Sequence, residues 1–225
     1  HDDGDREFLG LLAGWVGATL ERDAAMVAQR ESEEAIRTLY VTASNSRMSL
    51  DDKIGYLLRH ACVRSGLDGG VLALGGAGGL TVRVSTGDTD ALRQGAPLVG
   101  DGAMADTLLY ADHLVAIEDV RGSAYGSAAI ATLHGVGALM GTSIRIAGRA
   151  AGILVLGGRD ARPAFRLADK EYLQLLAQWI GGELEREQTV RALGEANQDL
   201  EALLASAQRL AHEADAANKA KSEFL

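Results

Sequence analysis

The sequence predicts an α+β protein whose antiparallel sheet carries helices on its faces, with a long helix on either side of this globular part. Three observations lead to this prediction. Most of the 28 glycines fall between residues 66 and 158. In that stretch the apolar pattern changes to the alternation of strands. The two ends of the chain keep a helical pattern without any proline.

The composition is that of a folded, acidic protein. Of the 225 residues, 47% are hydrophobic and 24% are charged, and the formal net charge is −9. The acidic excess argues against a nucleic-acid or anionic-membrane partner, since both favour Lys and Arg. No apolar run reaches the ~18 residues of a membrane span. The acidic start without Met indicates a cytoplasmic fragment of a longer polypeptide, without a secretory signal.

An internal repeat predicts the organisation of the chain. Residues 5–23 and 169–187 align without gaps, and 11 of the 19 positions are identical, Trp15 and Trp179 among them. Both copies have apolar residues at the three- and four-residue spacing of an amphipathic helix. We therefore expect residues 48–187 to be a complete module closed by the second copy. Residues 1–47 would then hold the end helix of a preceding module and a helical linker, and residues 188–225 a signalling helix.

The predicted elements of the module follow from local signals. Ser49 and Asp52 have the spacing of a capping box and predict a helix that ends at Gly66. Glycine-rich and Ala147–Arg149 turns between alternating segments predict two hairpins. Short helices are expected at 102–111 and before the second hairpin. The five predicted strands are 71–74, 80–85, 114–120, 136–146 and 150–156.

The C-terminal helix carries an apolar seam that predicts a parallel coiled coil. Residues at the a and d positions recur over four heptads, which favours a dimer over a solvated single helix. In the order of the chain, these residues are Leu193, Ala196, Leu200, Leu203, Ala207, Leu210, Ala214 and Ala217. We expect the homodimer interface at Leu193, Leu200, Leu203, Ala207 and Leu210, with helices 5–46 and 165–220 running parallel in the two copies.

In this order and spacing, four segments resemble the GAF domains of bacterial sensor histidine kinases. The segments are SLDDKIGYLLRHACVRSGLDGGVLAL, MADTLLYADHLVAIEDV, GALMGTSIRIAGRAAGILVL and FRLADKEYLQLLAQWIGGELERE. The terminal NKAKSEFL resembles the start of a kinase dimerisation helix, but the phosphoacceptor His that follows there in the family is absent. The resemblance implies a GAF-like sensory and relay fragment that is not itself an enzyme, from a parent that is a histidine protein kinase.

The resemblance also implies a ligand cavity, whose contents the residues leave unknown. Covalent bilin needs a pocket cysteine, and the one cysteine, Cys62, fits a buried helix position better. Haem would need an axial ligand such as His113 or His134, although His134 fits an ordinary loop residue better. The single cysteine also excludes the sulfoxide-reductase and zinc-cage chemistries, which need several. No metal site is predicted, and the pocket candidates are Arg83, Met104, Tyr125, His134 and Thr142.

The sequence thus predicts a relay module of a two-component system that passes ligand or upstream signals through dimeric helices to a kinase core in cis. Two alternatives remain open. One is a bilin or haem photosensor, redox or gas sensor. The other is a structural dimerisation linker whose small Ala, Gly and Val side chains pack the cavity shut.

Overall fold

The computed structural model describes residues 2–76, 79–87, 92–98, 102–128 and 135–223. Contacts along the chain divide it into two units, residues 1–181 and residues 182–225. In the described part of the chain, no helix has an apolar stretch long enough to cross a membrane.

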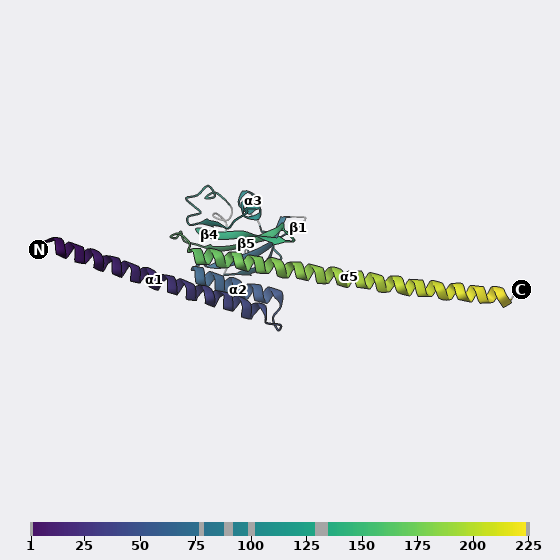
Figure 1. Ribbon diagram of the computed structural model, residues 1–225. Helices are drawn as coiled ribbons and strands as arrows, with labels where there is room; N and C mark the ends of the chain where they lie inside the picture. Colours follow the sequence, from purple (N-terminus) through teal and green to yellow (C-terminus); the bar gives the residue numbers. More distant parts are fainter. Residues whose placement is uncertain (1, 77–78, 88–91, 99–101, 129–134, 224–225) are drawn as a thin grey trace. The chain divides into compact units, whose positions relative to one another are not determined.

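A five-stranded antiparallel sheet forms the centre of the first unit (Figure 1). Its spatial order is β2-β1-β5-β4-β3, and each strand pairs antiparallel with its neighbour. The strands are β1 (Gly69–Gly76), β2 (Gly79–Thr86), β3 (Val115–Ile117), β4 (Ala138–Ile146) and β5 (Arg149–Gly158). The predicted α+β class and all five strands are confirmed. β3 is shorter than the predicted 114–120 because its partner β4 begins at Ala138, one residue before the residue that pairs with Ile117.

The first helix of the module, α2 (Leu50–Ser65), begins and ends where the sequence predicts. The Ser49 hydroxyl accepts from the Asp52 backbone N–H at 3.1 Å and donates to the Asp52 carboxylate at 2.6 Å. Gly66 ends the helix in the left-handed region, with φ 63°. The inner face of α2 is buried, and it includes Cys62 and not Val63, which is 83% exposed.

Two apolar layers cover opposite faces of the sheet (Figure 1). One layer is α3 (Gly102–Tyr110), and its Met104 and Leu108 pack with alternate strand residues such as Val71 and Ile153. The other layer is α2 with the first turns of α5 (Leu167–Glu223). In this layer the rings of His60 and Tyr172 pack edge to face, with their centroids 5.7 Å apart. Leu72, Leu154 and Leu156 are among the strand residues buried on this second face.

The β4–β5 hairpin turns at Ala147 and Gly148, as the sequence predicts. Both residues have a positive φ, 48° and 77°. A type I′ turn requires this of its two central residues, and its twist matches that of the flanking strands. The turn therefore keeps β4 and β5 in register from Ile146–Arg149 to Ala138–Gly158, with one irregularity after Ile144.

Both ends of the chain are long helices, as predicted. α1 spans Asp2–Ala43, and α5 continues from the module to Glu223. The end of α1 is attached to α2 through the Lys53 ammonium, which donates to the Ala43 carbonyl at 2.8 Å. A cation at this place also stabilises the negative end of the α1 helix dipole. The second predicted short helix lies mostly outside the described residues, and residues 121–127 before it form turns and bends.

Candidate functional site

A cluster of packed apolar side chains covers the sheet face beneath α3, and we call this cluster the α3 chamber. Its buried members are Val71, Ala73, Val82, Met104, Leu108, Val120, Leu139, Ile153 and Val155. Tyr125 packs against them, and its hydroxyl lies 3.0 Å from the Thr107 hydroxyl of α3, so a hydrogen bond joins the loop to the helix.

The structure brings two of the five predicted pocket residues together. Met104 and Tyr125 both belong to the chamber. Thr142 is buried on the opposite face, since it pairs across the sheet with Leu154, while the next residue Ile153 faces the chamber. His134 lies outside the described residues.

Arg83 is placed away from the chamber, beside the start of α2. Its Nε donates to the Asp51 carboxylate at 2.8 Å. The β1–β2 pairing shifts between Leu72 and Ala73, so that Val82 and Val84 face opposite sides and Arg83 lies at the irregularity. Sequence alternation alone does not predict this shift.

Cys62 lies on the α2 side of the sheet, away from the chamber. Its Sγ contacts the Thr86 hydroxyl at 3.9 Å, and burial raises the pKa of the thiol to about 11. A thiol of this kind is mostly protonated at neutral pH and reacts slowly. His113, one of the two haem candidates, is exposed. In the part of the chain that the structure describes, no group of three His, Cys, Asp or Glu side chains is arranged to hold a metal.

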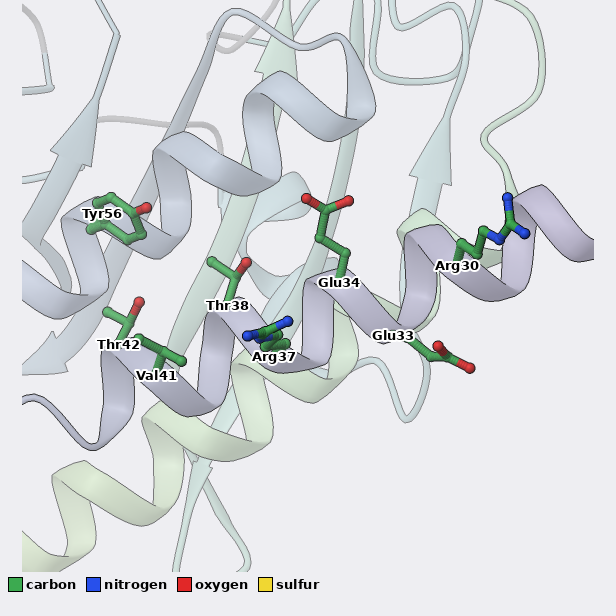
Figure 2. A pocket seen from close by; sticks show the side chains of 8 residues that line it. All are labelled: Arg30, Glu33, Glu34, Arg37, Thr38, Val41, Thr42 and Tyr56. Atoms are coloured by element: carbon green, nitrogen blue, oxygen red, sulfur yellow. The ribbon is translucent and has the colours of Figure 1, made fainter.

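A groove of about 600 Å³ lies along α1 where it passes α2 (Figure 2). Tyr56 comes from α2, and the other lining residues come from α1. They are two arginines, two glutamates and three small side chains: Arg30, Glu33, Glu34, Arg37, Thr38, Val41 and Thr42. Ile36 and Tyr40 of α1 do not line the groove, and both are exposed. The surface is mixed in character, which suits packing against another protein better than enclosing a small molecule.

The predicted seam on α5 is exposed in the single chain. Leu193, Leu200, Leu203 and Leu210 each have more than half of their surface open, and Ala207 is exposed too. They lie on a continuous helix at heptad spacing. Such a row of solvent-exposed leucines is unusual for a soluble monomer.

Four charged residues that the sequence analysis does not single out meet beside the start of α5. They are Glu31 of α1, Arg64 of α2, and Arg166 and Asp169, and we call them the Asp169 cluster. Asp169 is only 2% exposed. The available sequence signal is that Asp169 is identical to Asp5 in the internal repeat.

The family of the chain follows from its sequence as well as its fold. The family model described as "GAF domain" matches residues 25–184, more than half of the chain. The chain belongs to the GAF domain family. This confirms the resemblance stated above, and the match extends beyond the predicted module into α1. A GAF domain is a regulatory and sensory domain.

Solved structures with the same fold include GAF domains of different proteins. One is the GAF domain of a protein from Pseudomonas syringae pv. tomato that is described as a sensor histidine kinase. The two sequences are 24% identical, the match covers 73% of this chain and 97% of the other chain, and the TM-score is 0.53. Another is the GAF domain of an Acinetobacter phosphoenolpyruvate-protein phosphotransferase. It is 15% identical to this chain, the match covers 72% of this chain and 95% of the other chain, and the TM-score is 0.55. The phycocyanobilin-bound GAF domain of a cyanobacterial phytochrome is 15% identical to this chain. The match covers 69% of this chain and 94% of the other chain, and the TM-score is 0.54.

At these identities the similarity shows the shared fold alone. No curated protein sequence matches the chain.

Proposed function

We propose that this GAF domain is the sensory and relay module of a two-component sensor histidine kinase, and that it passes signals through paired helices to a kinase core in cis in the cytoplasm. The exposed leucine seam on α5 carries the proposal. The similarity to the GAF domain of the Pseudomonas protein agrees with it.

The seam supports a parallel homodimer. Burying a leucine fully stabilises an association by about 1.5–3 kcal/mol, so the four seam leucines supply a substantial driving force when two copies pair. The alanines between them let the helices approach closely. A dimeric helix that continues from the domain can transmit a change of rotation or stagger to whatever follows it.

Sedimentation velocity tests this dimer. The double variant Leu200→Asp/Leu203→Asp places charges in the seam, where they cannot be desolvated cheaply, so we expect the dimer to become a monomer. The control, Gln198→Asp/Ala205→Asp, adds the same two charges at f positions that face away from the partner. The control should remain dimeric. An unchanged dimer in the seam variant would disprove the coiled coil.

We also propose that α1 begins with the end helix of a preceding GAF module. Six of the eight buried positions of the second copy are identical in the first copy: Asp169, Leu173, Leu176, Ala177, Gly181 and Leu184. Residues 5–23 therefore keep the inward face of a domain-closing helix. Trp15, the counterpart of the partly buried Trp179, is 69% exposed in this chain. A preceding module would cover that face.

We propose that the domain receives its signal in one of two ways: from a ligand bound non-covalently at the α3 chamber, or through α1. The position and raised pKa of Cys62 speak against a thioether-linked bilin in the chamber. The Thr107–Tyr125 pair gives the chamber a polar group with which to orient a small molecule.

A further inference from the structure

Asp169 is held at its buried site by two arginines. Arg166 donates from Nε to Oδ2 at 2.9 Å and from Nη2 to Oδ1 at 3.0 Å, which is the bidentate geometry that suits a carboxylate. Arg64 approaches Oδ1 with its Nε at 3.2 Å. Asp169 lies in the first turn of α5, where its negative charge also complements the helix dipole. Both arginines are therefore fixed to the start of α5.

The same two arginines also bind α1 at Glu31. The Arg166 Nη1 donates to the Glu31 carboxylate at 2.9 Å, and the Arg64 Nη1 donates to the Glu31 backbone carbonyl at 2.6 Å. Arg166 Nη2 further donates to the Arg64 carbonyl at 3.0 Å. Each guanidinium thus reaches from α1 to α5.

The two halves of the cluster differ in strength. The Asp169 side is dry: the Asp169 side chain is 1% exposed, and the Arg64 guanidinium lies 5.7 Å from the ring centre of Tyr172. Burial raises the pKa of Tyr172 to about 12, so its ring stays neutral beside the arginine. The Asp169 hydrogen bonds raise the pKa of Arg166. Removing a partner here would leave a buried charge unpaired.

The Glu31 side is open to water. The side chains of Arg166 and Glu31 are 51% and 39% exposed, so solvent screens their attraction. Of the two carboxylate contacts of Arg166, the one with Glu31 is therefore weaker than the one with the buried Asp169. Arg166 thus joins a solvent-exposed contact on α1 to a buried contact on α5.

We propose that Arg166 is a coupling residue that makes the stability of the first turns of α5 depend on the position of α1 at Glu31. The cluster holds two positive and two negative charges. If α1 moves away, Arg166 loses one carboxylate and Arg64 loses a carbonyl acceptor, so the hydrogen bonds to Asp169 rearrange. The inference rests on the proposed relay function, because it supplies the path from one flanking helix to the other.

Hydrogen–deuterium exchange of the full chain tests the coupling. The variant Glu31→Gln removes the carboxylate charge at position 31 of α1. Because a partly exposed ion pair is lost, we expect the amides of residues 167–176 to exchange roughly three- to tenfold faster. The control, Glu33→Gln, changes an exposed glutamate of the same helix that bonds to Gln29 within α1. It should leave α5 unchanged. Unaltered exchange at 167–176 in Glu31→Gln would overturn the proposal.

Coupling must also act in the reverse direction. Asp169→Asn should raise exchange in α1 around Glu31, whereas Glu171→Gln, an exposed neighbour, should not. If Asp169→Asn does not fold, the double variant Glu31→Gln/Arg166→Gln replaces it: its exchange at 167–176 should match that of Arg166→Gln alone. Additive effects would contradict a shared path. These measurements do not require dimerisation, so a failed coupling and a failed coiled coil give separate results.

Discussion

At the residue scale, two adjacent glycines of α5 have opposite surroundings. The backbone carbonyl oxygen of Arg145 in β4 occupies the space that a Cβ on Gly181 would need. A Cβ on Gly182 would meet nothing within 4 Å. The repeat reproduces this difference, since Gly181 corresponds to Gly17 and Gly182 corresponds to Ala18. The glycine that is kept in both copies is the one that lets the helix lie close to the sheet.

We predict opposite effects of the two Gly→Ala substitutions on the free energy of unfolding. Gly181→Ala should destabilise the domain by about 1–3 kcal/mol, because the helix must move away from β4. Gly182→Ala should stabilise it by about 1 kcal/mol, because alanine favours the helix. Urea unfolding followed by circular dichroism measures both. Equal effects of the two changes would mean that α5 does not pack on β4 at this point.

At the element scale, the two copies of the repeat are both helices, but one closes the described domain and the other does not. The copies differ at eight positions, of which Tyr172 and Ile180 are buried in the second copy. Their counterparts Phe8 and Val16 are apolar and slightly smaller. The Tyr172 hydroxyl has no hydrogen-bond partner among the described residues, so losing it costs little.

We therefore predict that residues 5–23 can replace residues 169–187. The chimera should fold, and its free energy of unfolding should fall by roughly 1–3 kcal/mol. The loss comes mainly from the Ile→Val change and from two glycines that the first copy would bring to exposed positions of the helix. As a control, residues 24–42 have the same length and are helical in the structure, but they would place Glu31 at the buried position of Leu176. That chimera should not fold. Thermal unfolding of both compares them, and an unfolded first chimera would rule out the proposed domain-closing role of residues 5–23.

At the scale of the whole molecule, the relay proposal predicts what the purified chain contains. We expect native mass spectrometry to show a dimer, because the exposed leucine seam is otherwise left in water. Denaturing the same sample identifies any bound molecule. An extra mass released on denaturation would support a non-covalently bound ligand as the input, while a bare dimer would support input through α1. A monomer would contradict the dimeric relay.

The sequence by itself determined the local elements of this protein. The Ser49–Asp52 cap, the left-handed Gly66, the Ala147–Gly148 turn and the helical periods of both ends all follow from interactions within a few residues. Local conformation depends on neighbours along the chain, so these features are visible in the sequence. The order and spacing of the segments also showed the GAF family.

Only the tertiary structure decided which residues share a site. Residues 31 and 166 are 135 positions apart, and no local pattern indicates that Arg166 reaches Glu31 and Asp169 together. Likewise, one register shift in the β1–β2 pair lies at Arg83, which pairs with Asp51 at α2, and strand alternation places Thr142 on the face opposite Met104. The physical reason is that ion pairs and sheet faces depend on how distant segments pack, and that packing is set by burial of the whole apolar core.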